Sequence, residues 1–194
     1  GFETPGSGIE ESMKKELKTI IDADMKRYYD KVPFIKPIQV RYLLAYRKAS
    51  YYKKKSIQGI YYRLRLQRLS EKTGIQLPTR ASIGRGLFIA HFGSIIVNPD
   101  AVLGCNVNIA PGVVIGKTNR GDKKGVPSIG NNVWIGANAV IVGNITIGDD
   151  VMIAPNAYVN MDVPAHSIVL GNPALIHARE NATEGYINRR ISIE

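Results

Sequence analysis

The stretch IGNNVWIGANAVIVGNITIGDDVMIAPNAYV, residues 129–159, decides the fold of this chain. An aliphatic residue recurs in it at every sixth position: Ile129, Ile135, Ile141, Ile147, Ile153 and Val159. A helix requires a period near 3.6 and an alternating strand a period of 2. A period of six fits three short strands joined by corners, which is one coil of a hexapeptide β-helix.

The same period continues toward the N-terminus. One run comprises Val97, Leu103, Ile109 and Ile115, and an earlier run, two residues out of phase, comprises Ile83, Ile89 and Ile95. Stacked coils would lie about 4.8 Å apart, with their aliphatic residues pointing inward. We therefore predict a mainly β fold, a parallel β-helix over residues 79–174. A β-sandwich of short strands is the alternative, but its turns would not keep a strict period.

The period fails once. Ile115 and Ile129 are 14 residues apart, so about eight extra residues leave the coil within the segment GKTNRGDKKGVPS, residues 116–128. Insertions in repeat proteins map to protruding loops, and such loops often carry function.

The N-terminal part differs in composition from the repeat region. Residues 1–78 contain 17 Lys/Arg and 8 Asp/Glu, whereas residues 79–194 contain 9 and 8. Helical spacing of apolar residues predicts helices over 14–32 and 38–73, with a break at Gly59 and a stop at Gly74. We expect residues 13–78 to form a basic α-helical region, 175–194 a C-terminal tail, and 1–12 a remnant before a native start at Met13.

Basic and aromatic residues are mixed between Lys36 and Lys72, where 11 Lys/Arg accompany a single acidic residue, Glu71. Six tyrosines lie among them: Tyr42, Tyr46, Tyr51, Tyr52, Tyr61 and Tyr62. Three interpretations are open: a helical cap whose tyrosines pack on the coils or on a neighbouring subunit, a helix at a membrane surface, or a nucleic-acid site. No recognised nucleic-acid motif accompanies the charge, so we expect no nucleic-acid partner.

Several site types are disfavoured by composition. No run of 18 apolar residues occurs, which argues against a transmembrane helix. Cys105 is the only cysteine, so an intrachain disulfide and a cysteine-based zinc site are excluded, and a reducing cytoplasm fits best. The three histidines are His91, His166 and His177, too widely spaced for a three-histidine zinc site, and we expect no metal.

From about Ile75 to Ala174 the chain resembles the serine acetyltransferase branch of the hexapeptide acyltransferases. Within that branch it looks most like the bacterial polysaccharide O-acetyltransferases. The resemblance is carried by IGRGLFIAHFGSIIVNPDAVLG (83–104), IAPGVVIGKTNRGDKKGVPSIG (109–130), NVWIGANAVIVGNITIG (132–148) and DVPAHSIVLGNPA (162–174). It implies a left-handed β-helix, a homotrimer, and acetyl-CoA bound in the groove between adjacent subunits.

By this resemblance His91 matches the general base that deprotonates the acceptor hydroxyl, a role that suits an imidazole. Three positions depart from the serine acetyltransferase pattern. Ala90 and Gln76 stand where those enzymes have aspartates, and Val126 stands where they have a second histidine. These groups belong to serine recognition and to orienting the base, so we interpret their absence as evidence against serine as the acceptor.

The resemblance also implies binding residues. Candidate acceptor contacts are Asn119 and Arg120, from the TNRG segment, together with Asn98. Candidate contacts to acetyl-CoA are Gly116, Trp134, Gly136, Ala137, Ala154, Gly171, Pro173 and Ala174. Cys105 is a possible acetyl-enzyme nucleophile, but a lone cysteine is more often a small packing residue, so we favour direct transfer.

We therefore predict an acetyl-CoA-dependent O-acetyltransferase. The leading acceptor is a sugar hydroxyl of a surface or capsular polysaccharide or its precursor. The alternatives are serine O-acetylation, as in cysteine biosynthesis, and a non-catalytic β-helical scaffold trimer. We expect a cytoplasmic protein, with peripheral contact to the inner membrane surface through residues 36–72.

Overall fold

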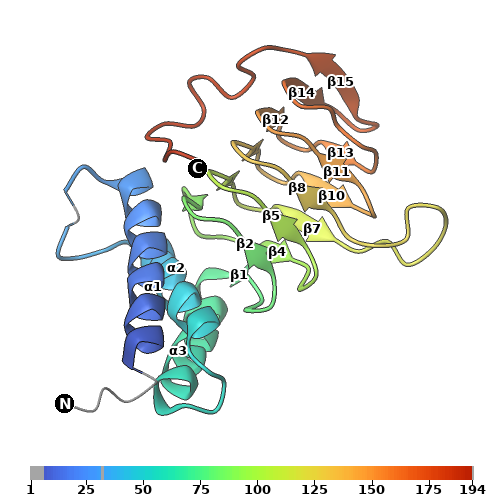
Figure 1. Ribbon diagram of the computed structural model, residues 1–194. Helices are drawn as coiled ribbons and strands as arrows, with labels where there is room; N and C mark the ends of the chain where they lie inside the picture. The colour runs from blue at the N-terminus through green and yellow to red at the C-terminus, as the bar shows by residue number, and fades with distance from the viewer. Residues whose placement is uncertain (1–6, 32, 194) are drawn as a thin grey trace.

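The computed structural model describes residues 7–31 and 33–193. Three helices come first: α1 (Ser7–Tyr28), α2 (Ile38–Tyr51) and α3 (Ile57–Thr73). They lie across one end of a parallel β-solenoid, whose coils then stack away from them (Figure 1). None of the helices formed by the described residues combines the length and the hydropathy needed to cross a bilayer.

The solenoid has three sheets, and the coils from β1 to β12 contribute a strand to each sheet in turn. Sheet A contains β1 (Ile75–Gln76), β4 (Ile95–Val97), β7 (Val114–Gly116), β10 (Val140–Val142) and β13 (Tyr158–Val159). Sheet B contains β2 (Ser82–Ile83), β5 (Val102–Leu103), β8 (Ser128–Ile129) and β11 (Thr146–Ile147). Sheet C contains β3 (Phe88–Ile89), β6 (Asn108–Ile109), β9 (Trp134–Ile135), β12 (Val151–Ile153), β14 (Ser167–Leu170) and β15 (Leu175–Ala178). Among the strands of the described residues, β15 alone pairs antiparallel, with β14.

The periodic aliphatic residues form the core, as predicted. Ile89, Ile109 and Ile135 are register partners on successive strands of sheet C, and all three are buried. Full burial of one such side chain contributes about 1.5–3 kcal/mol. The two-residue slip in the sequence period is taken up in β4, where Ile95 and Val97 both point inward. The mainly β solenoid is therefore confirmed.

The first coil has a free backbone edge, and side chains of α1 and α2 cover it. The Tyr42 hydroxyl accepts a hydrogen bond from Leu77 N at 2.8 Å, and the Arg47 guanidinium donates to Ile83 O at 2.7 Å and Gly84 O at 2.6 Å. Unpaired strand edges recruit other chains unless they are covered. The cap interpretation is thus confirmed for the inward-facing part of the basic region, including the buried Tyr42.

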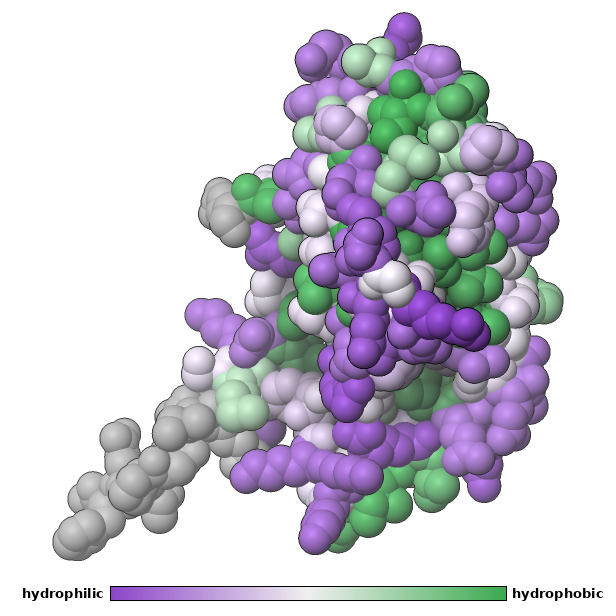
Figure 2. Space-filling view, turned by 90° about the vertical axis from the view of Figure 1, so that its right-hand side faces the viewer, coloured by the Kyte–Doolittle hydropathy of each residue, from purple (hydrophilic) through white to green (hydrophobic). Residues whose placement is uncertain are grey.

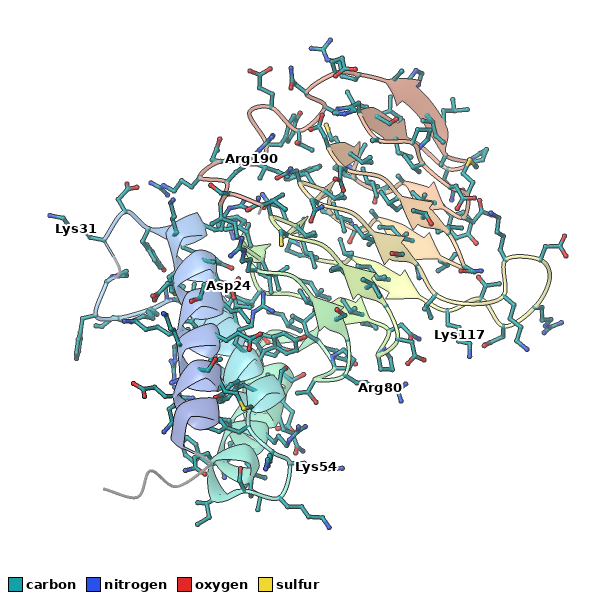
Figure 3. The ribbon with its side chains drawn as sticks, viewed as in Figure 1. Asp24, Lys31, Lys54, Arg80, Lys117 and Arg190 are labelled. Carbon is teal, nitrogen blue, oxygen red and sulfur yellow. The ribbon has the colours of Figure 1, made fainter. Side chains whose placement is uncertain are left out.

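A buried carboxylate connects α1, α2 and the first coil. Asp24 is fully buried and accepts from Arg47 Nε at 2.7 Å and Nη2 at 3.1 Å. Its Oδ1 also accepts from the backbone N–H groups of Gly86 at 2.8 Å and Leu87 at 3.0 Å. In Figure 3 Asp24 lies on the helix that faces the coils. Four hydrogen bonds compensate the cost of burying this charge.

The helix boundaries differ from the prediction in three places: the break in the second helix, and both ends of the first, which spans Ser7–Tyr28 and not 14–32. The chain leaves the helix at 52–56, not at Gly59, because Ser56 caps α3 by accepting from Gly59 N at 3.0 Å. Gly59 lies in the first turn, where a Cβ would overlap the Lys53 carbonyl oxygen. Gly74 ends α3 in the left-handed conformation, φ 75°, as predicted. Helix α1 begins at Ser7, inside the segment expected to be a remnant, and residues 1–6 lie outside the described part.

The C-terminal residues are more than a tail. Residues 179–193, here called the C-terminal strap, turn back along the solenoid toward α1 (Figure 1). Asn106 Nδ2 donates to Ile191 O at 2.9 Å, and Ile191 N donates back to Asn106 Oδ1 at 3.0 Å. Arg27 Nε donates to Asn188 O at 3.0 Å, so the strap connects the last coils to the first helix.

Candidate active site

The corners between sheets C and A form one continuous edge of the solenoid. This C–A edge consists of residues 90–94, 110–112, 136–138 and 154–156, and the turn between β14 and β15 at residues 171–173 continues it at the far end. Backbone hydrogen bonds join successive corners: Gly112 N donates to Ser94 O at 2.6 Å, and Asn138 N donates to Pro111 O at 3.0 Å. Asn156 N continues the column by donating to Ala137 O at 2.9 Å.

His91 lies on this edge, directly after β3, and its side chain is exposed. The backbone just before it is fixed by the helices. The Tyr28 hydroxyl accepts from Ile89 N at 2.6 Å and donates to Ile89 O at 3.2 Å, while Gln39 Nε2 donates to Ala90 O at 3.1 Å. Burial raises the pKa of Tyr28, so the hydroxyl keeps its proton and makes both bonds. The position of the candidate base therefore depends on α1 and α2.

Most of the predicted acetyl-CoA contacts share the C–A edge with His91. Gly136, Ala137 and Ala154 occupy the corners above it. Gly171 and Pro173 lie in the β14–β15 turn beyond them, and Ala174 follows as a buried residue. The turn at 171–173 is four coil steps from His91, about 19 Å at the usual strand spacing. An extended arm lying on small side chains can bridge that distance.

Gly136 has a structural reason to be glycine. A Cβ there would come within 2.5 Å of the backbone nitrogen of Pro155 in the next coil. The close stacking of the corners is therefore enough to require glycine at position 136. The methyl side chains of Ala137 and Ala154 are half-buried, so this edge leaves them partly accessible.

Two predicted contacts lie off the edge. Trp134 is on the outer face of sheet C, and its ring packs against Tyr186 of the C-terminal strap, with centroids 4.9 Å apart. Asn108 Nδ2 donates to Tyr186 O at 3.2 Å and holds the strap there. Gly116 ends β7 on sheet A, where the inserted loop begins.

The predicted acceptor contacts lie at the corner between sheets A and B. Asn98 Oδ1 accepts from Asp100 N at 3.0 Å in a local turn. Asn119 and Arg120 are exposed on the loop between β7 and β8, which protrudes from the solenoid (Figure 1). The width of sheet A separates all three from His91, so the structure does not bring them to the base within one chain.

The loop is ordered at its base by pairing with itself and with a later coil. Thr118 and Gly125 exchange two backbone hydrogen bonds of 2.9 Å. Lys123 Nζ lies 2.8 Å from Asp162 Oδ2, and this hydrogen bond holds the pKa of Asp162 below its usual value. Lys117 projects from the start of the loop, on the opposite side of the molecule from the helices (Figure 3).

The strap is anchored by a residue that sequence reasoning missed. Asp150 accepts from Ala182 N at 3.0 Å, from Thr183 N at 3.1 Å and from Thr183 Oγ1 at 2.6 Å. The fourth hydrogen-bond partner of the Asp150 carboxylate is His166, whose Nδ1 lies 3.0 Å from Asp150 Oδ2. Burial raises the pKa of Asp150, but the hydrogen bonds from Thr183 and His166 outweigh it, and the pKa lies below its usual value. No local pattern marks an acid whose partners are 16 and 33 residues away.

This anchor predicts a pH-dependent contribution to stability. The hydrogen bond to Asp150, aided by the Glu180 carboxylate, raises the pKa of His166 above 6.5. The stabilisation by His166 is therefore complete below pH 6.5 and is lost as the pH rises through the higher folded-state value. Thermal unfolding of wild type and His166→Ala should differ more at pH 6 than at pH 9. If wild type and His166→Ala differ equally at both pH values, the pH-dependent stabilisation is not due to the His166–Asp150 hydrogen bond. His177→Ala, which removes an exposed imidazole elsewhere, serves as the control.

The described residues contain no group of three or more His, Cys, Asp or Glu side chains positioned to hold a metal ion. Cys105 is a half-buried free thiol between sheets B and C, away from the C–A edge. Within residues 7–31 and 33–193 no side chain hydrogen-bonds to the His91 imidazole. His91 is thus the candidate general base that this edge offers.

Comparisons with known proteins place this geometry in a family. Residues 127–160 match the model described as bacterial transferase hexapeptide (six repeats). Serine acetyltransferase 2 of Arabidopsis thaliana is 40% identical over 107 residues, 55% of this chain and 33% of that protein. The serine acetyltransferase of Helicobacter pylori is 41% identical over 102 residues, 53% of this chain and 60% of that protein. The chain thus spans about a third to three-fifths of these curated relatives.

Solved structures of serine acetyltransferases superpose on a larger part of this chain than the sequence matches cover. The serine acetyltransferase of Neisseria gonorrhoeae in complex with serine superposes with a TM-score of 0.70 at 30% identity, covering 87% of this chain and 72% of that one. The Brucella abortus serine acetyltransferase in complex with coenzyme A gives 0.72 at 27% identity, covering 88% and 72%. The match therefore includes the helices as well as the solenoid.

These comparisons correct the predicted function. The polysaccharide acceptor is wrong, because the matching relatives and structures are serine acetyltransferases. The prediction gave too much weight to Ala90, Gln76 and Val126. Serine acetyltransferase 2 is 40% identical to this chain over 107 residues, so many single side chains differ between the two proteins. The predicted sugar contact therefore no longer applies to Asn98, Asn119 and Arg120. A role for these three residues in acceptor binding stays a prediction. The chain belongs to the hexapeptide-repeat transferases, among relatives that are serine acetyltransferases.

Proposed function

We propose that this chain is an acetyl-CoA-dependent serine O-acetyltransferase with His91 as its general base. The observation that carries the proposal is the C–A edge, where an exposed histidine lies in line with a column of small residues. The relatives support the two substrates, since one solved structure holds serine and another holds coenzyme A.

The proposed reaction is a direct transfer. The His91 imidazole takes the proton from the serine hydroxyl as the oxygen attacks the thioester carbonyl. The carbon–sulfur bond then breaks, and the sulfur leaves with a proton as the free thiol of CoA. Ala137 and Ala154 offer the flat surface along which the arm of CoA lies extended, so that its thioester reaches the level of His91.

Recognition of serine is expected to be weak. The amino acid carries a positive and a negative charge, but Ala90, next to the base, is uncharged, and so are Gln76 and Val126. We therefore expect a KM for serine at or above about 1 mM, the upper end of the usual range.

The test is thiol release from acetyl-CoA in the presence of L-serine, with L-alanine as a matched control that lacks only the hydroxyl. We expect release with serine, none above background with alanine, and O-acetylserine as the product by mass spectrometry. If acetyl-CoA binds by calorimetry but serine elicits no release, the proposed acceptor is wrong.

We further propose that the chain assembles as a homotrimer. The outer face of sheet A supports this, because Ile96 on β4 and Tyr158 on β13 expose 38% and 37% of their surface, and Val114 and Val140 join them in one register column. Light scattering should then give a mass of about three times 21.3 kDa. A mass of 21.3 kDa at micromolar concentration contradicts the assembly.

Tyr28 is proposed as a positioning residue. Tyr28→Phe removes both hydrogen bonds to Ile89 and leaves buried polar groups unpaired, which costs about 1–3 kcal/mol of stability. We expect kcat to fall by about tenfold, because the backbone before His91 relaxes, while the KM for acetyl-CoA stays unchanged. Tyr29→Phe is the control, since its hydroxyl makes no hydrogen bond within the described residues. An unchanged kcat in Tyr28→Phe would show that the contact is only structural.

A further inference from the structure

An apolar stripe on α3 faces away from the rest of the molecule. Ile57, Ile60, Tyr61 and Leu64 follow helical spacing, and each exposes about half or more of its surface: 85%, 49%, 54% and 53%. Residues of this size and polarity are usually buried, and a row of them on one helix face marks an interaction site.

The connection between α1 and α2 adds to the same surface. Phe34 and Ile35 are exposed to 99% and 83%. With Arg41 and Leu44 of α2 and Arg65 of α3 they line a hollow of about 380 Å³. A second hollow adjoins it and is lined by Arg41, Tyr61, Leu64, Arg65 and Arg68. The shared Arg41 and Arg65 make the two hollows one surface, here called the α2–α3 face.

The charge of this face has one sign. Lys36, Arg41, Lys48 and Arg65 all line the larger hollow, and no acidic residue does. Lys53, Lys54 and Lys55 line neither hollow; they are exposed at the turn before α3, at the other end of α2 from Phe34 and Ile35 (Figure 3). Figure 2, viewed from the right-hand side of Figure 1, shows hydrophobic and hydrophilic surface side by side at the lower end of the molecule.

The structure divides the basic, tyrosine-rich region into two surfaces. Tyr42, Tyr46 and Arg47 point toward the coils and are buried. Ile57, Tyr61 and Leu64 point outward, and they are accompanied by cations that make no ion pair within the described residues, Arg41 and Arg68 among them. Only the outward set is available to a partner.

The occupant must be anionic and must also accept aliphatic side chains. A second copy of this face would oppose cation to cation. A nucleic acid would satisfy the charges but would offer no apolar phase to Ile57 and Leu64. The surface of an anionic bilayer supplies both, with phosphates for the cations and the acyl boundary for the apolar row. We propose that the α2–α3 face binds anionic phospholipid membranes peripherally.

Flotation with two kinds of vesicle tests this proposal on the full chain. One kind is pure phosphatidylcholine, and the other contains 30% phosphatidylglycerol. We expect binding to the anionic vesicles only. Each cation near such a surface contributes about fivefold in partitioning, so Arg41→Gln/Arg65→Gln should weaken binding about 25-fold. Ile57→Ser/Leu64→Ser should weaken it about tenfold for each residue removed.

Lys117→Gln/Lys124→Gln is the matched control, because it removes the same charge from the loop on the opposite side. It should retain wild-type binding, and circular dichroism should show all variants folded. The proposal is overturned if wild type does not float with anionic vesicles. It is also overturned if the loop variant loses as much binding as the face variant, or if Ile57→Ser/Leu64→Ser binds fully. Tighter binding to a DNA oligonucleotide, unaffected by Ile57→Ser/Leu64→Ser, would indicate nucleic acid instead.

Discussion

Replacing His91 by alanine is expected to lower kcat for acetyl transfer to serine by about 100- to 10,000-fold. This is the usual contribution of a positioned general base. The fold should be unaffected, because the His91 side chain is exposed and makes no hydrogen bond within the described residues. Thiol release under saturating acetyl-CoA, together with circular dichroism of the same samples, measures both effects.

The matched control is His177→Ala, which removes another exposed imidazole from β15 on sheet C. It should keep kcat within a factor of two. A His91→Ala variant that stays folded and retains more than a third of the activity would remove His91 from the mechanism. A non-catalytic scaffold would show no acetyl transfer in wild type and would be indifferent to the substitution.

Replacing Asp24 by alanine is expected to lower the free energy of unfolding by about 3–5 kcal/mol. The substitution leaves the buried Arg47 charge without its carboxylate, and it leaves the N–H groups of Gly86 and Leu87 unpaired. Removing one partner of a buried ion pair has a cost of this size. Urea unfolding followed by circular dichroism measures the change.

The exposed pair of Arg80 and Asp100 provides the control. Its side chains lie 2.6 Å apart but are 69% and 54% exposed, so Asp100→Ala should cost at most about 1 kcal/mol. Replacing both buried partners, as in Asp24→Leu/Arg47→Met, should recover part of the loss, because no unpaired charge remains. A loss below about 1 kcal/mol for Asp24→Ala would show that the cap does not depend on this pair.

Acceptor choice was the weakest inference from sequence. Ala90, Gln76 and Val126 are real departures, but each is a single side chain, and the resemblance could not show how much of the site depends on it. The matching proteins remain serine acetyltransferases despite these differences. Substrate recognition depends on all the groups that surround a ligand in space. The positions of Ala90, Gln76 and Val126 are only three of these.

The solenoid could be predicted from residue spacing, because a six-residue period of inward aliphatics such as Ile109 and Ile135 can be buried only when coils stack in register. The sequence also determined that Gly74 ends the last helix, since the left-handed conformation strongly favours glycine there. Both are local consequences of residue spacing and backbone sterics.

Only the tertiary structure decided which side chains cover the first coil and which face outward. Asp24, Arg47 and Gly86 meet across as many as 62 residues, and Asp150 meets Thr183 across 33. Tyr42 and Tyr61 occupy the same basic segment, yet one is buried on the coils and the other is exposed. A free strand edge and a buried charge both need hydrogen-bond partners, and the partner is whichever group the fold brings within reach. Spacing along the sequence does not show which groups will be close in space.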